Sequence, residues 1–203
     1  MLPHEDIVDR EGHVPIELGR QIESRAKEVG LFSANLPENV GGGGLDYTSM
    51  AVIEREFGRT SHALHAWVAR PTELLLATEG GQKEHYLDPC VTGAKRELFA
   101  LSEPEAGSDI MSMKSHAKRD GDDWILNGSK HFISGPLMPD FAIVFAITGH
   151  DETPRGPRPR ITAFLVDVGM PGFDIQVGYN CVSYRGYLNF KLDFDNVRLS
   201  PNH

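Results

Sequence analysis

The sequence predicts an α+β fold, with an N-terminal helical domain followed by an antiparallel β-barrel-like middle domain. Before residue 88, apolar residues recur every three or four positions, the period of helices that bury one face. After Pro89 the chain has seven short β-branched or aromatic runs separated by Gly, Pro and Asp-Gly turns. Because the helices precede the strands without alternation, the pattern favours α+β over a doubly wound sheet.

The helical domain is predicted to cover residues 1–88. Pro15 suits a first helical position, and Asp46 is a good N-cap residue. Pro71 interrupts a long apolar stretch, which predicts a kink or two abutting helices there. The predicted helices are 15–30, 46–58, 61–78 and 82–87.

The β domain is predicted to cover residues 89–203. Asp120-Gly121, between two strand-like runs, is a hairpin signal, and a Pro- and Arg-rich loop is expected at 153–160. Seven short strands of this kind are typical of an antiparallel barrel or sandwich. The predicted strands are 98–102, 114–119, 124–130, 141–148, 161–167, 174–177 and 189–194.

Composition narrows the functional classes. With 40% hydrophobic and 24% charged residues, the sequence is typical of a globular protein, and no apolar run is long enough to cross a bilayer. The net charge of −9 argues against nucleic acid as a partner, because phosphates need a basic face. It does not argue against an anionic cofactor, since backbone N–H groups can hold phosphates.

Cysteine usage and the first residues predict a cytoplasmic location. Cys90 and Cys181 lie far apart without metal-type spacing, so both are expected to be reduced thiols. The first twelve residues are acidic and lack an apolar stretch behind a basic one, so neither a secretory signal nor an Arg-rich transit peptide is visible.

The segment 99–109, FALSEPEAGSD, is the most informative in the chain. It reads as a strand that runs into a turn, where Ser102, Gly107 and Ser108 offer hydroxyls and unobstructed backbone. Small residues at a strand end let a planar or phosphorylated ligand approach the main chain. A decorated β-turn without a ligand is the alternative interpretation.

Four motifs carry a family resemblance. Ala100-Leu-Ser-Glu, followed by Ala106-Gly-Ser-Asp109 and Ser112, resembles the signature of the acyl-CoA dehydrogenase family. Three more pieces resemble family motifs in the family's order, namely LPENVGG at 36–42, NGSKHFIS at 127–134 and FDNVR at 194–198. The resemblance spans nearly the whole chain.

The resemblance implies an N-terminal helical domain, a middle β domain and a C-terminal four-helix domain. This chain is expected to contain most of the first and all of the second, without the third and without one or more early helices. The family's catalytic base is a glutamate of the C-terminal domain. The resemblance therefore assigns no residue here to that role, and the chain is expected to be inactive alone.

The resemblance also implies an FAD-dependent oxidoreductase that removes hydrogens from Cα and Cβ of an acyl-CoA thioester, giving a 2-enoyl-CoA. Leu101 and Ser102 are expected at the pyrimidine edge of the flavin, and Ser134 near N5 and O4. Phe132 replaces a tryptophan that flanks the ring in many members. The expected flavin-binding residues are Phe99, Leu101, Ser102, Gly107, Ser108, Phe132, Ile133 and Ser134.

Substrate and partners follow from the same resemblance. Ser108 and Arg158 are expected to contact the acyl-CoA, and electron-transfer flavoprotein or a similar acceptor is expected to take the electrons. A homo-oligomer is expected. Glu103 is interpreted as a structural member of the signature and Glu105 as solvated. Without the resemblance, Phe132 and Ile133 read as ordinary strand core.

Other candidates have weaker support, and no metal site is predicted. The glycines at 41–44 are interpreted as a turn, since no Lys-Ser/Thr follows as in a phosphate loop. His62 and His65 lack a third ligand and are interpreted as exposed helix residues. The arginines at 155, 158 and 160 either form a solvated loop or meet the CoA 3′-phosphate. Arg70 either pairs with Glu73 at the surface, caps a kink, or faces an acyl pocket.

Two function classes remain open beside the dehydrogenase. The same fold hosts flavin oxidases and monooxygenases, and the fold alone does not choose among them. The polypeptide is alternatively a non-catalytic fragment or binding module. Retention of flavin by the purified protein separates the flavoenzyme from the non-binding alternative.

Overall fold

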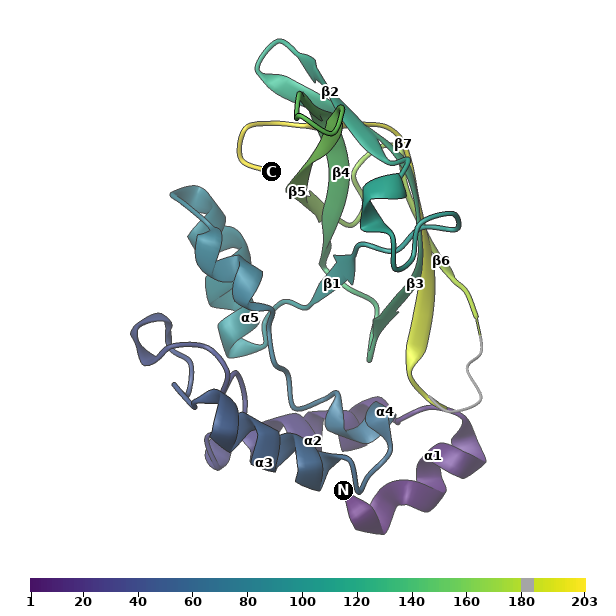
Figure 1. Ribbon diagram of the computed structural model, residues 1–203. Helices are drawn as coiled ribbons and strands as arrows, with labels where there is room; N and C mark the ends of the chain where they lie inside the picture. The colour runs from purple at the N-terminus through teal and green to yellow at the C-terminus, as the bar shows by residue number, and fades with distance from the viewer. Residues whose placement is uncertain (180–184) are drawn as a thin grey trace. The chain divides into compact units, whose positions relative to one another are not determined.

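The computed structural model describes residues 1–179 and 185–203, which divide into two compact units (Figure 1). The helical unit contains 1–96, 135–138 and the described part of 180–188. The sheet unit contains 97–134, 139–179 and 189–203. Cys181, one of the two predicted thiols, lies outside the described residues, whereas Cys90 is a buried free cysteine.

The helical unit consists of short helices joined by turns. Its α-helices are α1 (Glu5–Glu11), α2 (Ile16–Glu28), α3 (Tyr47–Phe57), α4 (His62–His65) and α5 (Asp88–Thr92). Single turns of tighter or wider helix are η1 (Leu2–His4), η2 (Glu38–Val40), η3 (Glu73–Ala77) and η4 (Lys83–Leu87). Asp46 caps α3 as predicted, because its side chain accepts a hydrogen bond of 2.7 Å from the Ser49 amide.

Helices α1 and α5 differ from the sequence-based prediction. Helix α1 was missed because Val8 is its only buried residue, which leaves no apolar period to detect. The stretch 61–78, predicted as a kinked helix or two abutting helices, forms two short helical segments, α4 and η3, with Pro71 between them. The last predicted helix continues as α5, where Pro89 lies in the first turn and is tolerated.

Two apolar clusters form the core of the helical unit. Trp67 is 1% exposed and packs against Gly19 of α2, where any side chain would overlap the indole. The first cluster contains Val8, Val14, Leu18, Ala63, Leu64 and Trp67. The second contains Ala26, Phe32, Phe57 and Val68. Burial of these side chains stabilises an otherwise marginal set of short helices.

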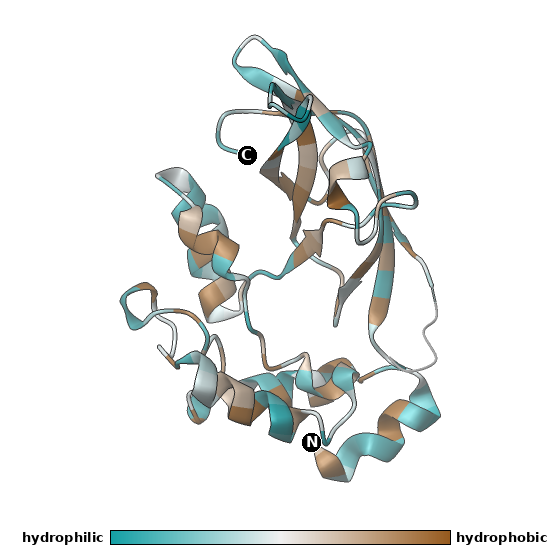
Figure 2. Cartoon of the chain, in the orientation of Figure 1, coloured by the Kyte–Doolittle hydropathy of each residue, from teal (hydrophilic) through white to brown (hydrophobic). Residues whose placement is uncertain are grey.

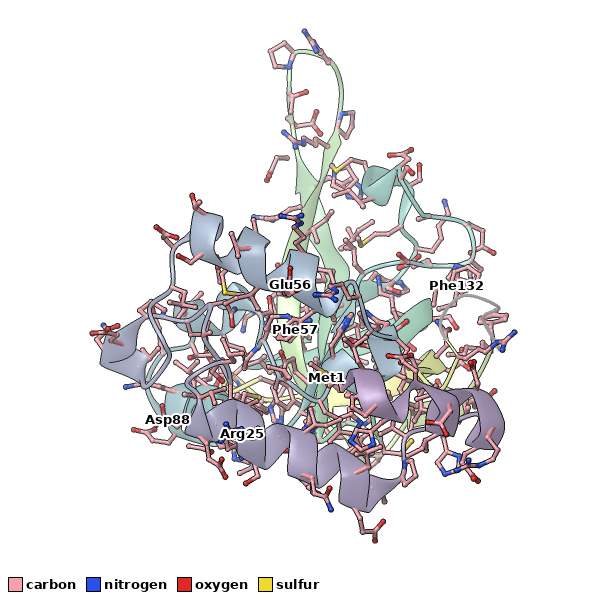
Figure 3. All side chains as sticks on the ribbon, turned by 90° about the horizontal axis from the view of Figure 1, so that it is seen from below. Met1, Arg25, Glu56, Phe57, Asp88 and Phe132 are labelled. Atoms are coloured by element: carbon pink, nitrogen blue, oxygen red, sulfur yellow. The ribbon has the colours of Figure 1, made fainter. Side chains whose placement is uncertain are left out.

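A largely apolar hollow of about 270 Å³ lies beside the second cluster. Its lining includes Met1, Phe57 and Arg25, which Figure 3 labels on the helical unit. Arg25 is already paired with Glu28 at 2.7 Å. Its one arginine is therefore already neutralised by a neighbouring carboxylate.

The sheet unit is a seven-stranded, mostly antiparallel sheet. Its strands are β1 (Glu97–Ala100), β2 (His116–Asp120), β3 (Asp123–Gly135), β4 (Phe141–Asp151), β5 (Arg158–Asp167), β6 (Phe173–Val177) and β7 (Leu188–Leu199), with η5 (Ile110–Ser112) before β2. The strand order is β1-β4-β2-β3-β7-β6, and β5 also pairs with β4. Hydrophobic residues concentrate along β4 and β5 (Figure 2), where Phe141, Val144 and Val166 are fully buried.

All seven predicted strands are confirmed, and so is the hairpin signal. Asp120 pairs with Asp123, which leaves Gly121-Asp122 as a two-residue turn with Gly121 at a φ of 64°. β5 begins at Arg158, so the predicted loop at 153–160 is partly strand. β4 pairs in parallel with β1 and with the start of β2, an exception to the antiparallel pattern that alternation cannot reveal.

Candidate functional site

The candidate segments 99–109 and 127–134 lie side by side in the sheet unit. Leu101 and Ser102 directly follow β1, whereas Lys130 and His131 lie within β3. The His131 amide donates a 3.0 Å hydrogen bond to the Ser102 carbonyl, and Lys130 Nζ donates one of 3.0 Å to the Leu101 carbonyl. Two segments about thirty residues apart in sequence are thus joined by one hydrogen bond between backbones and one from a side chain to a backbone carbonyl.

A buried ion pair fixes this junction. Glu103 is 2% exposed, and its carboxylate lies 2.7 Å from Nζ of the fully buried Lys130. The same carboxylate accepts hydrogen bonds from the backbone amides of Lys114 (2.5 Å) and Ser115 (3.0 Å). A buried charge is tolerated only when it is paired and hydrogen-bonded in this way. Glu103 therefore holds the turn after β1 against β2 and β3.

The environment keeps Glu103 ionised. Burial alone would raise the pKa of its carboxyl group, but the Lys114 amide, Lys130 and Ser115 all stabilise the anion and together lower the pKa below its ordinary value. Glu105 is exposed, as expected for a solvated residue. The signature glutamate is therefore a structural anion rather than an acid–base group.

Phe132 presents an aromatic face beside this junction. The residue is 56% exposed, and its ring lies 4.7 Å from the Tyr179 ring, centroid to centroid (Figure 3 labels Phe132). Its backbone adopts a φ of 54°, which side-chain-bearing residues rarely adopt and which costs on the order of 1–3 kcal/mol. Strain of this kind gathers at functional sites. Ile133 turns into the core and is 2% exposed.

Ser134 follows on the exposed side of β3, two residues after Phe132. Its Oγ accepts a hydrogen bond of 3.0 Å from Nδ2 of Asn189 in β7. Sequence reasoning missed both Asn189 and Tyr179, which lie on either side of the undescribed residues 180–184. No local motif marked them, and only the pairing of distant strands brings them here.

The remaining predicted residues lie at the surface of the same unit. Phe99 is 45% exposed, and its ring centroid lies 5.1 Å from that of Phe145. Gly107 and Ser108 are exposed in the turn after Glu103, with open space where a Gly107 side chain would be. Arg158 is exposed at the start of β5.

The β4–β5 hairpin tip borders a surface hollow of about 550 Å³. Its lining combines Met111, three residues after Ser108, with the segment 153–159, which includes Arg155 and Arg158. Arg160 points elsewhere and lies 3.8 Å from Asp151. Two of the three predicted arginines therefore share one hollow with the end of the signature turn.

The weaker candidates resolve as structural features. The segment 41–44 is a turn, as predicted, in which a side chain at Gly42 would overlap the Leu36 carbonyl. The interpretation of His62 and His65 as exposed was wrong, because His65 is 8% exposed and His62 is half-buried. The two rings share a hydrogen bond of 2.8 Å between His65 Nε2 and His62 Nδ1. Within residues 1–179 and 185–203 no three His, Cys, Asp or Glu residues form a metal-binding group.

Arg70 has a different partner from the predicted one. Its guanidinium is 2.8 Å from Glu54 of α3 rather than Glu73, and it lies 5.1 Å over the Phe57 ring. The Arg70 side chain also donates to the Val68 carbonyl at 3.3 Å. These contacts within the helical unit satisfy its charge, so no acyl carboxylate is needed to explain Arg70.

Comparison with known protein families agrees with this arrangement. The model of the acyl-CoA dehydrogenase N-terminal domain matches residues 1–94, and the model of the middle domain matches residues 98–197. The chain belongs to the acyl-CoA dehydrogenase family. The helical unit thus corresponds to the family's N-terminal domain and the sheet unit to its middle domain.

Individual members of the family are similar over most of the chain. The long-chain specific acyl-CoA dehydrogenase of Sus scrofa is 32% identical over 98% of this chain and 46% of its own length. Subunit CarC of the caffeyl-CoA reductase-Etf complex of Acetobacterium woodii is 36% identical over 86% of this chain and 45% of its own. The chain therefore spans about half the length of these relatives.

A solved structure gives the same result for the fold. The structure of a Mycobacterium smegmatis glutaryl-CoA dehydrogenase in complex with FADH2 superposes with a TM-score of 0.77 at 27% identity, over 98% of this chain and 50% of its own.

In the part of this chain that the structure describes, no helix is long and apolar enough to span a membrane.

Proposed function

We propose that this chain forms the flavin-binding part of an FAD-dependent enzyme that oxidises acyl-CoA thioesters to 2-enoyl-CoA. The observation that best supports this proposal is the pair of hydrogen bonds that joins Leu101–Ser102 to Lys130–His131. These bonds bring the signature turn next to the strand segment that contains Phe132 and Ser134. Family membership and the FADH2 complex of a related glutaryl-CoA dehydrogenase support the cofactor.

The residues present fit a flavin. An exposed aromatic ring at Phe132 suits the face of a planar ring system, and the hydroxyls of Ser102 and Ser134 suit its polar edges. The exposed backbone at Gly107 and Ser108 suits phosphate oxygens, which accept hydrogen bonds from main-chain N–H groups. FAD, when bound, would supply the hydride acceptor that no amino-acid side chain provides.

The protein's own contribution is orientation. In the proposed site, Leu101 and Ser102 hold the pyrimidine edge of the ring, Phe132 and Ile133 pass beside it, Phe99 borders it, and Ser134 donates a hydrogen bond to its opposite edge. The buried Glu103–Lys130 pair holds the turn after β1 against β3. A site held by a rigid sheet positions its donors without reorganisation when the ligand binds.

Substrate and partners complete the proposal. Ser108 is proposed to bind the phosphate groups of the CoA thioester, together with Arg158 and Arg155, which line the hollow at the β4–β5 tip. Electron-transfer flavoprotein is proposed as the electron acceptor, supported by the Acetobacterium relative, a subunit of a reductase-Etf complex. A homo-oligomeric state and a cytoplasmic location remain predictions.

Titration of the purified chain with FAD tests the proposal directly. We expect quenching of flavin fluorescence and a shifted visible absorption band, both weakened when Ser102 and Ser134 are replaced by alanine. Replacing Ser49, a half-buried serine of α3 outside the proposed site, by alanine serves as the matched control. A wild-type chain that leaves the flavin spectrum unchanged at saturating concentrations contradicts the proposal.

A further inference from the structure

Asn189 is a buried polar residue directly behind the proposed flavin edge. It is 7% exposed, and its side chain contacts Ser134 through the 3.0 Å hydrogen bond from Nδ2 to Oγ. Ser134 itself is exposed. A buried amide thus reaches an exposed hydroxyl from behind, across 55 residues of sequence.

The direction of this hydrogen bond decides where the serine hydrogen goes. An amide nitrogen donates and cannot accept, whereas a hydroxyl has one hydrogen to donate and two lone pairs. Because Ser134 Oγ accepts from Asn189, its own hydrogen remains available for another acceptor. Within the protein, Ser134 Oγ also lies 3.5 Å from the Phe132 carbonyl, which is the outer limit of a hydrogen bond.

The opposite orientation of the Asn189 amide is less favourable. Its Oδ1 is buried without a hydrogen-bond partner among the described residues. Rotating the amide by 180° would put both N–H hydrogens in that unpartnered position. Buried donors without a partner are rarer than buried acceptors without one. The orientation in which Nδ2 faces Ser134 is therefore preferred.

We infer that Asn189 is a positioning residue for the flavin. Its amide occupies one lone pair of Ser134 Oγ, so that the hydroxyl hydrogen is left to donate to an acceptor atom at the edge of the isoalloxazine ring. The inference rests on the proposed function and adds a residue to its site. Asn189 makes no contact with the cofactor and acts through Ser134 alone.

Two substitutions reverse or remove the donated bond. In Asn189→Asp a nearly isosteric carboxylate can only accept, so Ser134 must donate to it and no longer to the flavin. In Asn189→Leu the donor is lost without adding a charge. Either change is expected to raise the Kd for FAD about fivefold, the equivalent of one hydrogen bond, and to shift the flavin's visible absorption band. Far-UV circular dichroism confirms that each variant is folded.

A double-mutant cycle separates positioning from other effects. In a Ser134→Ala background, both substitutions at Asn189 are expected to change the Kd by less than about twofold, because the group they act through is gone. Asn127→Asp is the matched control, since Asn127 lies on the same strand β3 but bonds Asn196. This control is expected to leave the Kd and the spectrum unchanged.

The possible results are distinguishable. If the Asn189 substitutions weaken FAD binding equally with Ser134 present and with Ser134 replaced, the role of Asn189 is overturned. The same holds if the wild-type chain binds FAD and the Asn189 variants bind it as tightly. Either result leaves the proposed function standing. A wild-type chain that does not bind FAD overturns the proposed function, and the role of Asn189 with it. Weakening confined to the chain that retains Ser134 supports the role.

Discussion

Replacing Lys130 by methionine is expected to destabilise the sheet unit severely. Lys130 is fully buried beside Glu103, which is itself only 2% exposed. The change therefore leaves the Glu103 carboxylate buried without its cation. Removing one member of a buried ion pair costs about 3–5 kcal/mol, and the lost bond to the Leu101 carbonyl adds about 1 kcal/mol. That sum is a large fraction of the roughly 5–15 kcal/mol by which domains are stable.

Urea unfolding followed by circular dichroism measures the loss, and hydrogen exchange at the His131 amide shows whether it is local to the junction. The same substitution at Lys191, which is paired with Asp193 at 2.8 Å but 41% exposed, is the control and is expected to have a much smaller effect. Lys130→Met with Glu103→Leu should recover part of the loss, since no unpaired charge remains. A Lys130→Met chain as stable as the Lys191→Met chain would refute the reasoning.

The same pair sets an acid limit to stability. The folded-state pKa of Glu103 lies below its unfolded value, so its contribution is complete above an unfolded pKa of about 4.3 and disappears as pH falls through the folded pKa. Glu103→Gln is expected to flatten this part of the profile. Urea midpoints measured at a series of acid pH values provide the test, and parallel profiles for the two proteins would count against it.

Three further predictions concern backbone strain and histidine burial. Gly128 has a φ of 144°, and a side chain there would overlap Ser115, so Gly128→Ala should lower the free energy of unfolding in urea by more than about 2 kcal/mol. Gly121 lies in an open turn, so Gly121→Ala should lower it by about 1 kcal/mol. Phe132→Gly should relieve a positive φ and raise the melting temperature while weakening FAD binding, and a lower melting temperature would contradict the strain argument. Burial lowers the pKa of His62 from 6.5 to about 4, so the unfolded chain binds more protons between these values and stability should fall as pH falls across them. His62→Phe should flatten that slope in thermal melts, and an unchanged slope would assign it to other groups.

The sequence by itself determined the local elements and the family. Runs of β-branched or aromatic residues between turn residues located all seven strands, Asp46 marked the start of α3, and Asp120-Gly121 marked a hairpin, because each signal depends on neighbouring residues alone. The motif between Ala100 and Ser112 identified the family, and the match of residues 98–197 to the middle-domain model confirms it.

The tertiary structure alone decided which of these residues act together. Lys130 reads as an ordinary polar position in a strand, yet the pairing of β3 with the turn after β1 buries it against Glu103. His65 is buried because α4 packs its side chain toward the Phe57 carbonyl, and Asn189 reaches Ser134 only because β7 lies next to β3. Propensity and periodicity act over a few residues, whereas burial and partner choice depend on which distant strands and helices pack together. A strand's composition therefore specifies that it forms, and the register of the folded sheet specifies what its polar residues do.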